Sequence, residues 1–389
     1  MKVCIATLSQ FHMFDLARQV DRFGCLRKLY SGYPACRVRG VSRDKMGALP
    51  WPAIPGMFAN RFGPDWLRHT LGVSALASFD NWVADRLLPC DVFHALSGFG
   101  LRSHIAARQR YGALTVCDRG SSHIVFQDEL LRDEYAHWGV PYSGIDRRII
   151  ERELSEYESC DRIIVPSLFS YRSFIEKGVP EHKLRRNPYG VDLAAFQPLP
   201  KTDAVFRVIY VGGLSLRKGV PYLLEALCPL RLPNFELCLA GPLTPELRPL
   251  MARFEGKYRY LGTVAKTELL HHYSQSSVFV LPSVEDGFGL VLGQAMACGL
   301  PVIATTNTGA EDLCANGAEG FIVPIRSAAA IRERVVQLYE NPELRDQMGV
   351  AALRRVHVLG GWDNYGAQTI RNYEEALATN RGAAGVAMA

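Results

Sequence analysis

Two glycine-containing turns carry the charged residues whose types and spacing are best suited to chemistry. In the first, Gly212-Gly213 is followed by Arg217 and Lys218; in the second, Glu285-Asp286-Gly287-Phe288-Gly289 precedes a helical segment, Leu290 to Cys298. Each turn follows an apolar run that is typical of a buried strand. The free N–H groups and dipole at a helix N-terminus attract anions, and the two basic residues add fixed positive charge. The pattern predicts an anion site where the two turns meet.

Alternating strand and helix patterns must position these turns. Strands are expected at 2–8, 91–95, 114–117 and 162–166, and again at 206–211, 235–240, 258–261, 277–281, 301–304 and 320–323. Helical spacing marks 13–23, 127–138, 146–160 and 362–378. The fold class predicted is α/β, with two doubly wound Rossmann-like domains that face each other across a cleft.

Prolines and glycines near 187–192 indicate the domain boundary. The first domain is expected at 1–190 and the second at 191–357. Residues 358–389 are expected to form a helix that packs back on the first domain, followed by a short flexible tail.

Composition indicates a soluble globular protein. The formal charge of +5 is too small and too dispersed to favour nucleic acid, and neither a signal peptide nor an apolar membrane span is evident. The ten cysteines show no Cys-x-x-Cys pair, so buried thiols in a reducing cytoplasm are expected rather than a metal site or disulfides. Aromatic and arginine residues within 49–89 are compatible with a core-facing helix or with a surface that touches lipid, which leaves peripheral contact with the inner face of the plasma membrane as an alternative.

Several segments together resemble one family. They are 210–226, 281–304, 308–313 and 319–324, with weaker similarity at 162–167 and 187–192. They resemble the retaining glycosyltransferases of family 4, which have the GT-B architecture. The resemblance implies transfer of a sugar from a nucleoside-diphosphate sugar to a hydroxyl acceptor, with retention at the anomeric carbon. It also implies a role in polysaccharide or cell-envelope glycan assembly, with a glycan or a lipid-linked acceptor.

The resemblance assigns the donor site to the two turns. Arg217 and Lys218 would bind the diphosphate and stabilise it as a leaving group. Gly212 and Gly213 would form the adjacent turn. The second turn would contribute Gly287 and the N–H groups of Phe288, Gly289, Leu290 and Val291.

The sequence departs from the family at its acidic pair. Asp286 and Gln294 stand where the family has two glutamates, the first near the donor sugar and the second at the ribose hydroxyls. Glu285 is the alternative to Asp286 at the sugar, and Asp286 could instead cap the helix. Gly213 also replaces the family's arginine, a role that Arg217 could fill.

In the first domain, the family has a histidine in a strand-end loop near the donor sugar. Residue type selects His123, whereas position at the strand end selects Asp118 or Arg119. Gln10 and His12 are expected to line the same cleft, with Tyr189 near the linker.

No cofactor or metal is expected, because no Asp-x-Asp occurs and Arg217 and Lys218 can neutralise the diphosphate. Two alternatives remain: a noncatalytic nucleotide-sugar-binding protein, favoured by the departures at Gly213, Asp286 and Gln294, and a GT-B nucleotide-sugar epimerase.

Overall fold

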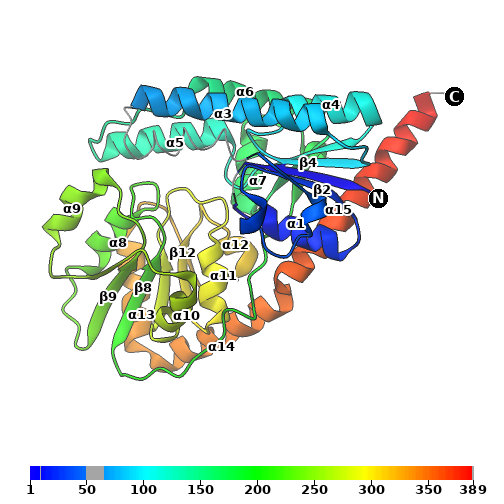
Figure 1. Ribbon diagram of the computed structural model, residues 1–389. Helices are drawn as coiled ribbons and strands as arrows, with labels where there is room; N and C mark the ends of the chain where they lie inside the picture. Colours follow the sequence, from blue (N-terminus) through cyan, green and yellow to red (C-terminus); the bar gives the residue numbers. More distant parts are fainter. Residues whose placement is uncertain (9, 50–64, 388–389) are drawn as a thin grey trace.

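The computed structural model describes residues 1–8, 10–49 and 65–387. They form two α/β units joined by two chain crossings (Figure 1). This confirms the predicted fold class.

The first unit is built on a seven-stranded, wholly parallel sheet in the order β3-β2-β1-β4-β5-β6-β7. Its strands are β1 (Val3–Thr7), β2 (Leu26–Ser31), β3 (Met46–Ala48), β4 (Val92–Leu96), β5 (Leu114–Asp118), β6 (Arg162–Val165) and β7 (Leu184–Arg186). Its helices are α1 (Met13–Arg22), α3 (Asp65–Arg86), α4 (Leu101–Tyr111), α5 (Ile124–His137), α6 (Arg147–Ser159) and α7 (Leu168–Glu176), with short 3-10 turns η1 (Ala35–Arg37), η2 (Arg43–Lys45) and η3 (Glu181–Lys183). Every residue of β1, β4 and β5 is buried, as expected for parallel strands covered on both faces.

The second unit has a six-stranded parallel sheet in the order β10-β9-β8-β11-β12-β13. Its strands are β8 (Phe206–Val211), β9 (Phe235–Ala240), β10 (Arg259–Gly262), β11 (Val278–Leu281), β12 (Val302–Thr305) and β13 (Gly320–Val323). Its helices are α8 (Val220–Leu227), α9 (Arg248–Arg253), α10 (Lys266–Ser274), α11 (Leu290–Ala297), α12 (Ala310–Leu313), α13 (Ala328–Glu340) and α14 (Pro342–Leu359), with η4 (Pro245–Leu247) before α9.

The order of strands decides where a ligand can bind. In the second sheet the order reverses between β8 and β11, so the loops that leave these two strands open a crevice at the carboxyl edge. Those loops are the two predicted glycine turns. The first sheet reverses between β1 and β4, which places the loops after β1, β4 and β5 at the corresponding edge.

The sequence missed β2, β3 and β7. Arg27 and Lys28 interrupt the apolar pattern of β2, while β3 and β7 are three-residue strands at the two edges of the sheet. Edge strands need no apolar run on both faces, so their patterns are weak.

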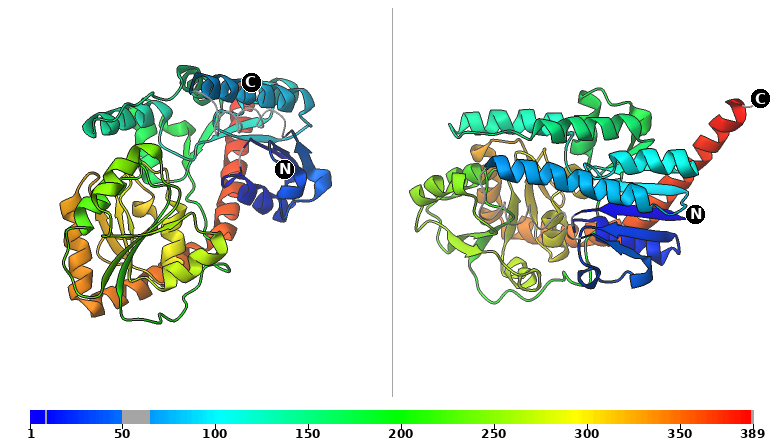
Figure 2. Two further views of the ribbon diagram at one scale, coloured as in Figure 1. Left: turned by 60° about the vertical axis from the view of Figure 1, so that its left-hand side comes forward. Right: turned by 45° about the horizontal axis from the view of Figure 1, so that its top comes forward.

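α15 (Gly361–Ala387) returns from the second unit to the first, where it contacts α1 and β5. Figure 2 shows this helix running beside the first sheet. Within 49–89, residues 50–64 lie outside the described part of the chain. Phe79 and Val83 of α3 are buried in the core of the first unit, so the end of α3 has the core-facing role.

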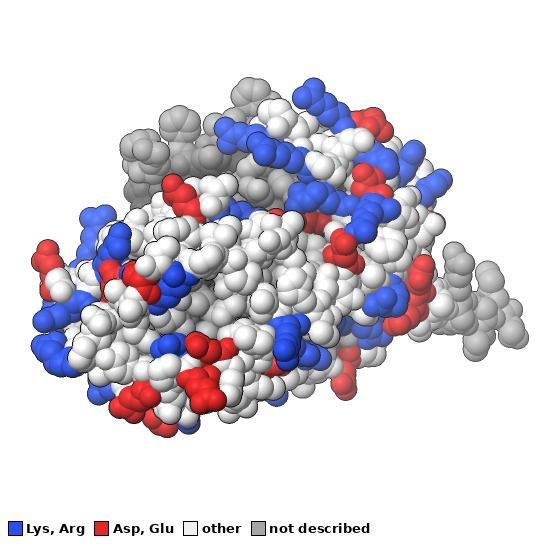
Figure 3. All heavy atoms as spheres, turned by 90° about the horizontal axis from the view of Figure 1, so that it is seen from below, with Lys and Arg blue, Asp and Glu red and all other residues white. Residues whose placement is uncertain are grey.

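Charge is mixed on the surface. On the face seen in Figure 3, Lys and Arg side chains are interspersed with Asp and Glu rather than gathered in one continuous patch. Among the described residues, no helix is both long and apolar enough to cross a membrane.

Candidate active site

The two glycine turns of the second unit are joined by backbone hydrogen bonds. The N–H groups of Val284 and Glu285 donate to the carbonyl oxygen of Arg217, at 3.0 and 3.2 Å. Gly219 has φ +65°, and a Cβ there would lie 1.9 Å from the carbonyl oxygen of Pro282. Only glycine allows this approach, so Gly219 fixes the first turn against the second.

Lys218 and Asp286 form an ion pair where the turns meet, and both side chains are largely buried, at 13% and 17% exposed. The other carboxylate oxygen of Asp286 accepts from the N–H of Gly289 at 3.1 Å and, more weakly, from that of Phe288 at 3.4 Å. Burial and the neighbouring Arg217 lower the pKa of Lys218, although Asp286 opposes this shift. Asp286 therefore caps the turn before α11 and neutralises Lys218 at the same time.

This pair lines a cavity of about 190 Å³ between the two units. The second unit lines one side of this cavity with residues from β8, β11, the loops that follow these strands and the start of α11. They are Tyr210, Val211, Gly212, Lys218, Leu281, Asp286, Phe288, Gly289, Leu290 and Val291. The first unit adds Phe11, Gly120 and Tyr189. The predicted residues Gly212, Lys218, Asp286, Phe288, Gly289, Leu290 and Val291 are thus brought together at one site.

Gly287 packs closely against the first unit. A Cβ at Gly287 would lie 2.2 Å from the carbonyl oxygen of Gly120. The hydroxyls of Ser167 and Ser170 also donate to the Gly287 carbonyl, at 2.5 and 3.1 Å. The second turn is therefore held against the first unit.

Glu285 has a different environment from Asp286. It is fully buried and does not line the cavity. Its carboxylate pairs with Arg217 at 2.9 Å and accepts from Ser121, Ser122 and Gln127 of the first unit. Burial alone would raise the pKa of Glu285, but Arg217 and the hydroxyl donors lower it to about 2. Of the two acidic candidates, Asp286 is the one that faces the cavity.

Gln294 and Gly213 lie at the margin of the site. Tyr273 donates to Oε1 of Gln294 at 3.3 Å, and neither Gln294 nor Gly213 lines the cavity. The Gly213 carbonyl accepts from the Tyr210 hydroxyl at 2.8 Å, and a Cβ at Gly213 would meet no atom within 4 Å. A Cβ atom at this position would therefore meet no clash.

His123 does not line the cavity that contains Lys218 and Asp286. Its Nδ1 accepts from the N–H of Val125 at 3.3 Å and so caps α5, while its ring packs against Tyr157 and Phe174. It lines a separate cavity of about 430 Å³ beside α6 and α7. Burial, with Arg119 and Lys177, lowers the pKa of His123 to about 4, so the ring is neutral near pH 7.

Asp118 is the centre of a buried polar network at the end of β5. One of its oxygens is 2.9 Å from Nε2 of His12 and 3.0 Å from Nε2 of His94, and Nδ1 of His94 is 2.6 Å from the hydroxyl of Tyr373 on α15. Burial opposes ionisation of Asp118, but the two histidines hold its pKa well below the usual range. Arg119 instead contacts Glu153 and Gln127, at 2.9 and 2.7 Å.

Sequence reasoning missed His94, Gln127 and Tyr373. His94 was detectable as a polar residue inside an apolar strand, whereas Gln127 and Tyr373 carried no signal. Gln10 is exposed and does not line the cavity. His12 does not line it either but stacks on Tyr189, at 4.2 Å between ring centres, and supports that wall from behind.

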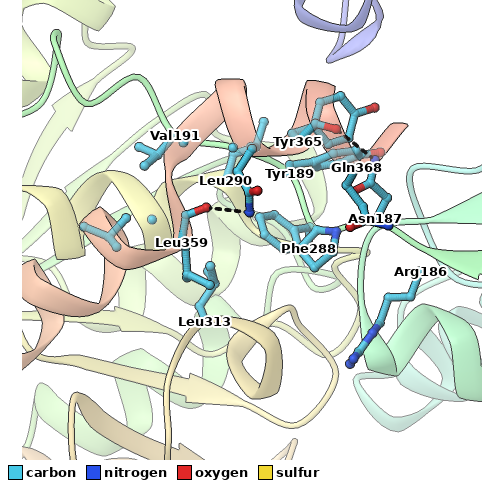
Figure 4. A pocket seen from close by; sticks show the side chains of 16 residues that line it. Arg186, Asn187, Tyr189, Val191, Phe288, Leu290, Leu313, Leu359, Tyr365 and Gln368 are labelled. Atoms are coloured by element: carbon cyan, nitrogen blue, oxygen red, sulfur yellow. Dashed lines mark hydrogen bonds between the residues drawn. The ribbon is translucent and has the colours of Figure 1, made fainter. Parts of the chain in front are cut away.

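A third cavity, of about 200 Å³, lies behind Tyr189 and Phe288 at the domain crossings. It is lined by the linker 186–191, one side of α11 and the junction of α14 with α15. Figure 4 shows Tyr189 and Phe288 together between the linker and α15. The centres of these two rings are 5.3 Å apart, and the rings separate this cavity from the one lined by Lys218 and Asp286.

The fold has close counterparts among solved structures. Sucrose-phosphate synthase from Thermosynechococcus elongatus superposes with a TM-score of 0.72 at 19% identity, over 97% of this chain and 100% of that one. HepE from Anabaena, solved with UDP-glucose, superposes with a TM-score of 0.67 at 16% identity, over 97% and 100%. The fold and the position of the site between the sheets define a protein of GT-B architecture.

Residues 193–355 match the family model of glycosyl transferases group 1. The chain is 32% identical over 209 residues to a D-inositol 3-phosphate glycosyltransferase of Pseudarthrobacter chlorophenolicus, covering 49% of this chain and 50% of that protein. It is also 32% identical over 196 residues to a phosphatidyl-myo-inositol mannosyltransferase of Mycolicibacterium smegmatis, covering 48% and 50%. The chain spans about half the length of these curated relatives. The family match contains Arg217, Lys218, Asp286 and Gln294.

Proposed function

We propose that this protein is a retaining glycosyltransferase that moves a sugar from a nucleoside-diphosphate sugar to a hydroxyl acceptor. The observation that carries the proposal is the Lys218–Asp286 pair at the N-terminus of α11, in a cavity lined by both units. A bound diphosphate would replace Asp286 as the partner of Lys218 and would accept from the free N–H groups of Leu290 and Val291. The UDP-glucose complex of HepE supports a donor of this class.

In the proposed reaction, the bond between the anomeric carbon and the diphosphate oxygen breaks as the acceptor oxygen bonds to the same face. The acceptor proton passes to the leaving phosphate. Lys218 and the start of α11 stabilise the negative charge that develops on the diphosphate. Asp286 accepts from the N–H of Gly289 and pairs with Lys218, and Glu285 is saturated by donors, so neither is placed as a free covalent nucleophile. This supports retention through a same-face mechanism rather than through two successive displacements.

We propose turnover without a metal, because Lys218 supplies the charge that a divalent cation would otherwise add. Among the residues with described side chains, no group of three or more His, Cys, Asp and Glu is arranged to hold an ion. Activity lost on adding a chelator and restored by manganese would contradict metal-independent turnover.

The acceptor is proposed to be a glycan or a lipid-linked sugar in polysaccharide or cell-envelope assembly. The relatives include a putative colanic acid glycosyltransferase and an O-antigen chain mannosyltransferase of Escherichia coli. We propose a cytoplasmic protein, with peripheral membrane contact where the acceptor is lipid-linked.

The test is calorimetry against a panel of nucleotide-sugars, followed by assays of donor hydrolysis and transfer. Binding with slow hydrolysis or transfer, and an anomeric configuration retained in the product by NMR, is the expected result. Binding without either reaction favours the noncatalytic alternative that the departures at Gly213, Asp286 and Gln294 suggest. Conversion of the donor without an acceptor favours an epimerase.

A further inference from the structure

Helix α5 of the first unit lies over the second unit and is tied to it near both ends (Figure 1). Near its start, Ser121, Ser122 and Gln127 donate to Glu285, at 2.6, 2.8 and 3.0 Å. Near its end, the buried Glu134 accepts from Arg326 at 2.5 Å and from the hydroxyl of Tyr222 at 2.9 Å. Both ties connect the two units, so both depend on closure of the cleft.

The tie at Glu285 differs because its carboxylate is shared between the two units. Arg217, on its own side, donates to Oε2 at 2.9 Å and also to the Glu285 carbonyl at 3.2 Å. The remaining side-chain donors all come from the first unit. When the units separate, the carboxylate loses those donors and keeps only Arg217, now in water. The Glu285 carboxylate is wholly buried when the cleft is closed and solvated when the cleft is open. Its ion pair with Arg217 therefore differs in strength between the two states.

Arg217 connects the environment of Glu285 to the candidate active site. Its side chain is 36% exposed and does not line the cavity, whereas its neighbour Lys218 does. With Glu285 held by three donors from the first unit, the guanidinium has a fixed direction beside the Lys218–Asp286 pair. Without them, the Arg217–Glu285 pair is free to reorient.

We propose that Glu285 is a positioning residue that couples closure of the two units to the orientation of Arg217. The coupling to Arg217 rests on the proposed function, whereas the part of Glu285 in holding the two units closed does not. The role is distinct from that of Asp286, which faces the cavity.

The first experiment measures closure without any ligand. Spin labels are placed on Cys36, exposed in the first unit, and on a Val350→Cys substitution in α14 of the second, with Cys25 changed to Ser. The distance distribution between the labels is compared for the parent protein and for Ser121→Ala/Ser122→Ala. We expect the double variant to shift toward an open population. An unchanged distribution overturns the proposal, provided that the circular dichroism spectrum and unfolding midpoint show a folded variant.

A matched control breaks the other tie. Glu134→Gln weakens the contact with Arg326 but leaves Glu285 and its donors in place. Because the donors to Glu285 are retained, this variant is expected to stay nearer the closed distance distribution than Ser121→Ala/Ser122→Ala does. Glu285→Gln is the second test variant, because it removes the charge that Arg217 pairs with and leaves the first unit unchanged.

The second experiment separates binding from turnover. In Ser121→Ala/Ser122→Ala, the Kd for the preferred nucleoside diphosphate should change by less than about twofold, because its binding groups lie in the second unit, while kcat should fall about tenfold. Equal losses in Kd and kcat, or no loss in kcat, contradict the coupling. If the wild-type protein binds no nucleotide, the proposed function fails, while the ligand-free distance measurement still decides whether Glu285 holds the units closed.

Discussion

Lys218 and Asp286 neutralise each other, and the side chains of both are largely buried. A diphosphate that binds there must compete with Asp286 for the ammonium group. The pair therefore keeps a buried cation compensated until a stronger anion arrives. Two predictions at the residue scale follow from this exchange.

Lys218→Ala should weaken binding of the nucleoside diphosphate by about 2–3 kcal/mol and lower kcat/KM, because a charge-assisted bond to the phosphate is lost. Calorimetry and steady-state kinetics measure the two effects. Lys266→Ala is the matched control: this lysine of the same unit is 62% exposed, pairs with Asp192 at the surface and does not line the cavity. An unchanged kcat/KM for Lys218→Ala would remove this residue from the proposed role.

Asp286→Asn should act in opposite directions on binding and on turnover. The amide no longer competes for Lys218, so the nucleoside diphosphate is expected to bind several-fold more tightly. Turnover should fall, because the carboxylate that faces the cavity, where the sugar is proposed to bind, has lost its charge. The measurement is Kd by calorimetry beside kcat; weaker binding would show that Asp286 acts mainly as the cap of the turn.

At the scale of elements, His123 belongs to α5 rather than to the cavity. His123→Ala should lower the free energy of unfolding by about 1–2 kcal/mol, because the cap at Val125 is lost. The kcat/KM of the folded variant is expected to change by less than about twofold. Chemical denaturation and kinetics test both parts. A loss of two orders of magnitude in kcat/KM with unchanged stability would instead support the catalytic role that the sequence suggested.

The loop between β4 and α4 is held by a buried carboxylate. Glu156 accepts from the N–H groups of Gly98 and Gly100, at 2.6 and 2.9 Å. Burial and the neighbouring Glu153 raise the pKa of Glu156 to about 8, against the effect of these donors. The folded protein thus holds a proton that the unfolded chain releases above its ordinary pKa near 4.5.

This shift gives a pH prediction. Because the pKa of Glu156 is raised on folding, its contribution to stability is complete below about pH 4.5 and is lost as the pH rises toward 8. Glu156→Gln should flatten that part of the stability profile. Denaturation experiments between pH 5 and pH 9, a range of about four units, give the slope of the free energy of unfolding against pH for the parent protein and for Glu156→Gln. Parallel slopes of the free energy of unfolding in the two proteins would show that Glu156 of the folded protein is ionised across this pH range.

At the scale of the whole molecule, α15 joins the two units a second time. Tyr373 on this helix reaches His94 in the first sheet, and His94 in turn contacts Asp118. The network ties the returning helix to the strand ends that carry the first-unit side of the cleft.

Tyr373→Phe should lower the free energy of unfolding by about 1–3 kcal/mol, because Nδ1 of the buried His94 loses its partner. Urea denaturation measures the loss. Thr379→Val is the control, since its hydroxyl bonds only to the Glu375 carbonyl of the same helix on an exposed surface. Equal effects of the two substitutions would argue against an anchoring role for Tyr373.

The sequence by itself determined the strands of the second sheet, the central strands of the first and the two glycine turns. Apolar runs that end in glycine turns define β8, β11 and the start of α11 through contacts between near neighbours, so local spacing is enough to identify them. Arg27 and Lys28 hid β2 for the same reason, because the local pattern there is charged.

Only the tertiary structure decided what each polar residue does. Glu285 and Asp286 are adjacent in sequence, yet one is saturated by Ser121, Ser122 and Gln127 and the other faces the cavity. His123 stands in the loop that the family comparison favours, yet its ring turns toward Tyr157 and Phe174. The role of a charged or polar side chain depends on which partners remove it from water, and such partners can lie 279 residues away along the chain, as Tyr373 does from His94.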